Sequence, residues 1–220
     1  MSQSIKKFYS YFRSSTAYRL RIALNLKNIV PQETVFVNLL KGEQHGDAYK
    51  AVNPAGAVPA FELEDGTILT QSAAMLEWLE ENYPDTPLLF ADYVLRAKVR
   101  AFANVISSEM HPINNLRVLK YLVGELSLED SQKMQWMHHW MHKGFLVCEG
   151  MLEGQSGEFC FGNTPSHADI CLVPQIYNAL RFKVDMSAYP RLMAVYEYAL
   201  QHLAFDAAAP EKQPDCPNPS

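Results

Sequence analysis

The chain has 220 residues, of which 48% are hydrophobic and 20% charged, and its formal net charge is -5 at pH 7. This acidic balance argues against a nucleic-acid-binding protein, which needs a basic patch or stripe. No apolar run approaches the roughly 18 residues that a membrane span needs, and the first residues lack the apolar core of a signal peptide. The four cysteines show neither C-x-x-C nor metal-ligand spacing. We therefore expect reduced thiols in a cytoplasmic protein without a bound metal, a nucleic-acid partner or a membrane anchor.

The first forty residues predict a strand, a helix and a second strand. Residues 5–12 form an aromatic-rich run, and residues 33–39 are rich in β-branched and aromatic side chains, as strands are. Between them, residues 17–29 place apolar side chains at helical spacing. Ser14 or Ser15 stands where the N-cap of that helix is expected. The pattern indicates a β-α-β unit.

The next part of the chain predicts a turn, a β-hairpin and a helix. Val58-Pro59 precedes a short apolar run, and Asp65-Gly66 separates this run from another, which is a strong hairpin signal. Gln71-Ser72 then opens a helical pattern that continues to Asn82. The order β-α-β, X-Pro, β-β-α is that of a thioredoxin-like domain. In this fold we expect the Val58-Pro59 bond to be cis.

Beyond residue 82 the sequence predicts only helices. Residues 83–90 contain two prolines and are interpreted as a linker. Residues 91–206 carry four apolar stripes at helical spacing, which predict an all-helical domain. The proline-rich residues 207–220 are expected to form a loosely ordered tail. We therefore expect two domains, an α/β thioredoxin-like one in residues 1–82 and an all-α one in residues 91–206.

Two features of the helical part are interpreted as structural. The methionine stripe from Met134 to Met141 has no clustered Cys or His on the same face, so we expect it to pack in the core. Ser166 and Asp169 have the spacing of a capping box, so Asp169 is expected to stabilise a helix and not to act as an acid. Three arginines are expected to form structural ion pairs: Arg19, Arg21 and Arg117.

Three motifs of the thioredoxin-like part suit the binding of a small anionic peptide with a thiol, and glutathione is the obvious candidate. They are Ser14-Ser15-Thr16, Val58-Pro59 and Gln71-Ser72. A hydroxyl that donates to sulfur and a helix N-terminus both stabilise a thiolate. The Val58 backbone would pair with the peptide like an added strand, and a helix start at Ser72 favours a carboxylate. Each serine motif taken alone is explained as well by helix capping.

Sequence strings along nearly the whole chain resemble the zeta class of cytosolic glutathione transferases, which includes the maleylacetoacetate and maleylpyruvate isomerases. The matching strings are residues 10–15, 19–24, 53–59, 71–72, 111–117, 162–169, 174–175 and 178–185. The class usually carries a cysteine where Thr16 stands, which leaves the role of this position open. The resemblance implies glutathione as the cofactor and a homodimer with two-fold symmetry.

The resemblance also implies the residues that bind glutathione: Ser14, Ser15, His45, Val58, Gln71 and Ser72. The last two would hold the γ-glutamyl carboxylate. Ser15 would be the principal donor to the thiol, assisted by Ser14 and Thr16. His45 would lie near the glycyl end, although a solvated loop histidine is nearly as simple an interpretation.

The substrates of these isomerases carry two carboxylates, so cationic and polar side chains are expected near the sulfur. Arg13 adjoins the serines, and Arg181 lies where the class presents a substrate-facing arginine. Both side chains suit bidentate pairing with a carboxylate. His111 and Asn115 are four residues apart and are expected on one face of a helix that Pro112 bends. Surface salt bridging is the alternative for the arginines, and a place on the helix surface is the alternative for His111.

The resemblance therefore implies an enzyme, a glutathione-dependent cis–trans isomerase. It would convert maleylacetoacetate, or maleylpyruvate, to the fumaryl product in the catabolism of tyrosine, phenylalanine or other aromatic compounds. One alternative is a zeta-type transferase or dehalogenase that acts on small α-halo acids or other electrophiles. Another is a binding module of the same fold without turnover, which the intact serine motifs argue against.

Overall fold

The structure, a computed structural model, describes residues 3–217, and the chain divides into two compact units. One, named here the sheet unit, joins residues 1–88 to residues 200–220, and the other, the helical unit, comprises residues 89–199. The division near residue 88 falls inside the predicted linker. The structure differs from the expected domains at the C-terminus, because residues 200–206 were expected in the helical domain and the following residues in a tail.

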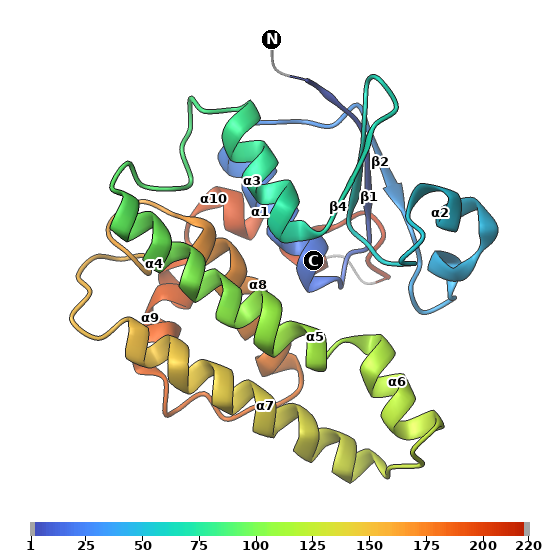
Figure 1. The fold of residues 1–220 in the computed structure, drawn as a ribbon. Helices are drawn as coiled ribbons and strands as arrows, with labels where there is room; N and C mark the ends of the chain where they lie inside the picture. The colour runs from blue at the N-terminus through green and yellow to red at the C-terminus, as the bar shows by residue number, and fades with distance from the viewer. Residues whose placement is uncertain (1–2, 218–220) are drawn as a thin grey trace. The chain divides into compact units, whose positions relative to one another are not determined.

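The sheet unit contains a four-stranded mixed sheet with the strand order β2-β1-β3-β4 (Figure 1). Its strands are β1 (Ile5–Ser10), β2 (Glu33–Phe36), β3 (Ala60–Leu63) and β4 (Ile68–Thr70). β1 pairs in parallel with β2 and antiparallel with β3, and β3 and β4 form the predicted hairpin. Gly66 in the hairpin turn has a φ of 84°, a conformation that glycine adopts without strain. This topology confirms the predicted thioredoxin-like order.

The helices of the sheet unit cover both faces of the sheet. They are α1 (Ser15–Leu26), α2 (Asp47–Val52), α3 (Ser72–Asn82) and α10 (Leu203–Asp206), with short 3-10 turns η1 (Glu43–His45) and η3 (Pro210–Lys212). In Figure 1, α1 and α3 lie against one face of the sheet and α2 lies on the other side. Residues 17–24 of α1 are all buried, because α3 and α10 pack against the helix on the sides that the sheet leaves uncovered.

A buried lysine holds the C-terminal ends of α1 and α3 together. The ammonium group of Lys27 donates to Glu80 Oε2 at 3.0 Å and to the main-chain carbonyls of Tyr83 and Thr86 at 2.8 and 2.7 Å. All three of its N–H donors are therefore used, which offsets the cost of burying the charge. Glu80 in turn accepts the N–H of Leu88. This network fixes the segment that the sequence identified as a linker.

The C-terminal segment is bound to the sheet unit by hydrogen bonds from several side chains. Asn25 donates to the carbonyl of Ala204 at 2.9 Å, and Arg21 donates to that of Ala208 at 2.9 Å. Within the segment, the side chain of Gln213 donates to the carbonyls of residues 207 and 209. This arrangement differs from the loose tail expected from the prolines, since composition does not reveal partners on α1. Residues 218–220 lie outside the described residues.

The helical unit contains the helices α4 (Tyr93–Asn104), η2 (Val105–Met110, a π-helix), α5 (His111–Ile113), α6 (Leu116–Gly124), α7 (Asp130–Met151), α8 (His167–Arg181) and α9 (Pro190–Ala199). Every residue of α8 from 167 to 176 is buried, and α8 packs against α4 and α9. Met137 and Met141 of α7 are fully buried, which agrees with the expected packing role. Among residues 3–217, no group of three or more His, Cys, Asp or Glu side chains is placed to hold a metal ion.

The predicted capping box begins α8. Asp169 Oδ2 accepts both the N–H and the hydroxyl of Ser166 at 2.8 Å, and Ser166 Oγ accepts the N–H of Ala168 at 3.3 Å. The second carboxylate oxygen accepts the N–H of Cys160 at 2.8 Å, so Asp169 also fixes the loop before the helix. Burial raises the pKa of Asp169, and these hydrogen bonds oppose that rise. The geometry supports the structural interpretation of this residue.

The four cysteines differ sharply in exposure. Cys148, Cys160 and Cys171 are buried, and Cys216 is partly exposed. Burial raises the pKa of Cys148 to about 12 and that of Cys160 well above the ordinary thiol value. Since the thiolate is the reactive form, these two side chains are expected to be inert in the folded protein.

We therefore expect the native protein to react with the disulfide reagent DTNB at one thiol, Cys216, and the denatured protein to react at all four. The measurement is the absorbance of the released thionitrobenzoate before and after addition of guanidinium chloride. Cys216→Ser should abolish the native reaction. Rapid modification of a second thiol in the native Cys216→Ser protein would contradict the assigned burial.

Candidate active site

The loop between β1 and α1 brings three hydroxyl groups to the start of a helix. Ser14 is the N-cap of α1, and its Oγ accepts the N–H of Ala17 at 3.2 Å. Ser15 is the first helical residue and Thr16 the second. The first-turn N–H groups of a helix carry a partial positive charge, which favours an anion at this position.

A count of hydroxyl hydrogens singles out Ser15. Thr16 Oγ1 lies 3.0 Å from the carbonyl oxygen of Val58, and it must donate there because a carbonyl only accepts. The 2.9 Å contact between Ser14 Oγ and Thr16 Oγ1 therefore uses the hydrogen of Ser14. Within residues 3–217 the hydroxyl of Ser15 makes no hydrogen bond. Ser14 and Thr16 therefore spend their hydroxyl hydrogens on contacts within the protein, and the role of Ser15 as donor to a thiol stays a prediction.

The Val58-Pro59 turn lies beside this loop. Its peptide bond is cis, as the sequence predicted. Tyr49 and Asn53 both donate to the carbonyl of Ala57, at 2.8 and 2.7 Å, and thereby fix the residue before Val58. Within the described part of the chain, the N–H of Val58 donates to no protein acceptor, so it is available to pair with the backbone of a peptide.

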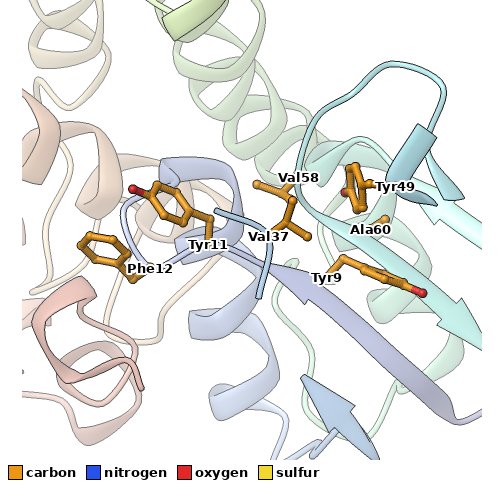
Figure 2. Close-up of a cluster of buried hydrophobic side chains, with 7 residues drawn as sticks. All are labelled: Tyr9, Tyr11, Phe12, Val37, Tyr49, Val58 and Ala60. Atoms are coloured by element: carbon orange, nitrogen blue, oxygen red, sulfur yellow. The ribbon is translucent and has the colours of Figure 1, made fainter. Parts of the chain in front are cut away.

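Figure 2 shows the side chains beneath this region. Val58 and Val37 lie in the middle of a buried cluster, with Tyr11 and Phe12 at one end and Tyr9 and Tyr49 at the other. Because the residues before the serines and the residue before the cis proline belong to one cluster, the two loops are packed as a single piece of structure.

The Gln71-Ser72 motif starts α3 in an unusual conformation. Gln71 has a φ of 67° and a ψ of 107°, which a non-glycine residue adopts only under constraint. Among the residues described, no side chain caps α3, so its first-turn N–H groups are available to a carboxylate. Ser72 is buried, and its Oγ accepts a hydrogen bond from Arg19 Nη1 at 3.3 Å. This motif therefore offers an anion site at a helix N-terminus.

Two contacts join the three motifs. Thr16 links the serine motif to Val58, and Arg19, on the same helix, links it to Ser72. Arg19 was expected only in an ion pair, and sequence reasoning missed this link because the two residues are 53 positions apart. The start of α3, the Val58 N–H and the Ser15 hydroxyl are the groups that the sequence predicted for the carboxylate, the backbone and the sulfur of glutathione, and these roles stay predictions.

His45 lies next to the same region. It is exposed on η1, and a Cβ atom added to Gly56 would come within 3.3 Å of its Nδ1, so the ring lies against the loop that leads to Val58. Its Nε2 is 3.1 Å from Nε2 of Gln44, a buried side chain that sequence reasoning missed. Within residues 3–217 the Gln44 Oε1 atom is buried and has no hydrogen-bond partner. The predicted contact of His45 with the glycyl end of glutathione stays a prediction.

The predicted substrate-binding residues belong to different units. Arg13 is half-buried in the sheet unit beside Ser14, with its guanidinium 5.0 Å from the centre of the Phe12 ring. Arg181 ends α8 in the helical unit, where it donates to Asn178 at 3.1 Å and stacks 4.1 Å from the centre of the Phe182 ring. Their role toward a substrate stays a prediction.

The prediction that His111 and Asn115 share a helix face was wrong. The helix ends at Ile113, and Asn115 is the N-cap of the next helix, where its side-chain oxygen accepts the N–H of Arg117 at 3.2 Å. A π-helix ends at Met110, two residues before Pro112. A proline lacks an N–H and crowds the preceding turn, and this local widening accommodates it. The sequence showed the proline but not how the chain would adapt to it.

Comparisons with known proteins show the family to which the chain belongs. The family of glutathione S-transferase N-terminal domains matches residues 13–82. The chain is 45% identical to the probable maleylacetoacetate isomerase of Vibrio cholerae, over 94% of this chain and 96% of that protein. It is 44% identical to a solved holo structure of a maleylpyruvate isomerase, described as a bacterial glutathione S-transferase of the zeta class, with a TM-score of 0.91 and coverage of 95% and 99%.

A further solved structure is similar over the same extent. It is a maleylacetoacetate isomerase from Methylobacterium extorquens AM1 with bound malonate and glutathione, 38% identical, with a TM-score of 0.92 and coverage of 96% of this chain and 99% of that one. Fold and matched domain together define the class of protein, the glutathione transferases. Within that class the chain belongs to the zeta family, which includes the maleylacetoacetate and maleylpyruvate isomerases.

Proposed function

We propose that this chain is a glutathione-dependent isomerase that converts maleylacetoacetate, or maleylpyruvate, to the fumaryl product. The observation that carries the proposal is the junction of the three motifs by Thr16 and Arg19, which gathers one free hydroxyl, one free N–H and one uncapped helix N-terminus. Relatives named as isomerases of these two substrates, alike over nearly the full length of the chain, support the reaction.

The residues of the sheet unit would bind and activate the cofactor. Glutathione bound there would supply a thiolate, which can add reversibly to a conjugated cis double bond, allow that bond to rotate as a single bond and leave again as the thiolate. The Ser15 hydroxyl would donate to the sulfur, and the N-terminus of α1 would favour its negative charge, so the two together lower the pKa of the thiol. Val58 and Ser72 would hold the peptide in a fixed orientation.

Cationic and polar side chains would hold the dicarboxylate substrate. A relative with bound malonate and glutathione supports a substrate with two carboxylates. Arg13 would pair with one carboxylate and stabilise negative charge that develops on the adjacent carbonyl oxygen. Arg181 and His111 are proposed for the second carboxylate. For Asn115 only the amide N–H group is proposed, because its oxygen already caps α6.

The choice of substrate class can be tested with two compounds at one glutathione concentration. We expect rapid isomerisation of maleylacetone, followed by absorbance, and slow conjugation of 1-chloro-2,4-dinitrobenzene. Preferential conjugation, or release of halide from a small α-halo acid, would shift the assignment to a transferase or dehalogenase. Failure to bind glutathione-agarose would indicate a module without this chemistry.

We also propose that the protein works as a two-fold homodimer in the cytoplasm. Tyr93 and Val94 at the start of α4 are largely exposed, and such apolar side chains are suited to an interface. No helix within residues 3–217 is long and apolar enough to cross a membrane. Light scattering after gel filtration should give twice the mass of the 24.9 kDa chain, and a monomer mass would contradict the dimer.

A further inference from the structure

The backbone just before the serine motif is held by side chains from outside the loop. Arg21, two turns along α1, donates to the carbonyl of Tyr11 at 3.4 Å and to that of Phe12 at 2.9 Å. The N–H of Phe12 donates to Asp215 Oδ2 at 2.8 Å. The carbonyl of Tyr11 also accepts the N–H of Ser14 at 3.0 Å, which closes the turn. The turn that presents the hydroxyl groups is thus bound on both sides.

The same arginine binds the C-terminal segment. Arg21 Nε donates to the carbonyl of Ala208 at 2.9 Å, so its guanidinium bridges this segment and the serine loop. Cys216, which follows Asp215, packs against the buried cluster that contains Tyr11, Phe12 and Val58. Residues 208–216 are therefore linked to the loop in three ways: through the Arg21 bridge from the Ala208 carbonyl, through the Asp215 carboxylate and through the packing of Cys216. Arg13, Arg21 and Asp215 each contact Phe12 of this loop with a charged group.

The stability of the fold does not by itself explain why the Asp215 carboxylate lies at this position. Its second oxygen, Oδ1, is buried and accepts no hydrogen bond within residues 3–217. Burying an acceptor without a partner raises the free energy of the folded state, so Oδ1 does not explain why the carboxylate lies there. The hydrogen bond from the Phe12 N–H to Oδ2 does explain it. That bond spans 203 positions in the sequence and ends two residues before Ser14.

We propose that Asp215 is a positioning residue for thiol activation and that residues 208–216 form part of the glutathione site. By accepting the Phe12 N–H, its carboxylate fixes the turn that places the Ser15 hydroxyl at the sulfur. This inference rests on the proposed function, since it needs a thiol at Ser15. A displacement of about 1 Å between reacting groups lowers rates by up to about 10²-fold, so a hydrogen bond that fixes the loop affects the chemistry without touching the substrate.

The test compares Asp215→Ala, which removes the acceptor, with Asp215→Asn, which keeps an oxygen acceptor and removes the charge. For Asp215→Ala we expect kcat/KM to fall about tenfold at neutral pH and the pKa of bound glutathione, read from the ultraviolet absorbance of its thiolate, to rise by about one unit. The glutathione KM should change by less than about threefold, because Val58 and Ser72 are untouched. Asp215→Asn should remain close to the wild type in all three quantities.

Asp206→Ala is the matched control, since it removes an exposed carboxylate of α10, close in sequence to residues 208–216, whose ion-pair partner among the described residues is Lys212. A folded Asp215→Ala protein with an unchanged thiolate titration would overturn the proposal. The proposal would also be overturned if Asp215→Asn raised the thiol pKa and lowered kcat/KM as much as Asp215→Ala, because the charge and not the hydrogen bond would then matter. If Asp215→Ala does not fold, Asp215→Glu, which shifts the carboxylate by one methylene, should show the raised pKa, and a normal pKa would overturn the proposal.

The thiolate titration separates this inference from the proposed reaction, because it needs bound glutathione but no substrate. A shifted titration in a protein that does not isomerise maleylacetone would support Asp215 and refute the isomerase. Absence of glutathione binding by the wild type would refute both.

Discussion

Ser15→Ala is expected to lower kcat/KM for glutathione-dependent isomerisation about 10²-fold, the loss typical of removing one preorganised hydrogen-bond donor. Among the three hydroxyls of the motif, only that of Ser15 has a hydrogen not already donated within the described structure. Without it, the pKa of bound glutathione should rise by about one unit or more toward the free-thiol value near 8.5. The measurement is the pH dependence of kcat/KM with maleylacetone.

Ser14→Ala and Thr16→Val are the matched controls for this prediction. Ser14→Ala removes the N-cap of α1 and should cost about 1 kcal/mol of stability. Thr16→Val removes the bond to Val58 and should raise the glutathione KM more than it lowers kcat. If either variant lost as much of its rate as Ser15→Ala and showed the same shift in pKa, the assignment of the thiol donor would be wrong.

Asp169→Ala is expected to lower the free energy of unfolding by about 3–5 kcal/mol, the largest stability effect predicted here. The carboxylate accepts hydrogen bonds from the Ser166 N–H, the Ser166 hydroxyl and the Cys160 N–H, and hydrogen bonds to a charged group contribute about 1.5–3 kcal/mol each. Part of their sum is offset by the cost of burying the carboxylate. Denaturation by urea measures the loss. Refolding yield should also fall, whereas the glutathione affinity of the folded fraction should stay unchanged.

Asp185→Ala provides the control for that substitution. Asp185 is exposed and accepts the N–H of Ser187 at 2.9 Å together with the hydroxyl of the same residue, so its loss at the surface should cost about 1 kcal/mol or less. An Asp169→Ala protein of normal stability that had lost its activity would reverse the structural interpretation and make Asp169 a participant in the reaction.

The parts of the fold that the sequence predicted depend on short-range signals. Asp65-Gly66 predicts its hairpin because a tight turn needs a positive φ, and Ser166 and Asp169 predict a helix start because the two side chains are three residues apart. The C-terminal segment has no such signal. Its carbonyls accept hydrogen bonds from Asn25 and Arg21, which lie 179 and 187 positions away in the sequence. No local sequence pattern predicts such distant contacts.

In the candidate site, too, local patterns predicted some residues, whereas the contacts between distant residues could not be predicted. Ser14, Ser15 and Ser72 could be recognised because hydroxyls at helix starts follow a local rule. The contact that joins them could not, since Arg19 was expected to form a structural ion pair and instead lies buried and donates a hydrogen bond to Ser72. The same holds for Thr16: a hydroxyl replaces the expected cysteine, and only the structure shows that it donates to Val58 and so leaves Ser15 as the free donor.

The central claim is that the sheet unit binds glutathione and uses its sulfur to isomerise a maleyl compound. It is tested most directly by following maleylacetone isomerisation in the wild-type protein with glutathione, without it, and with S-methylglutathione, which keeps the peptide but blocks the thiol. We expect turnover only with glutathione, and competitive inhibition by the S-methyl form. Turnover without glutathione, or equal turnover with the blocked peptide, would contradict the account.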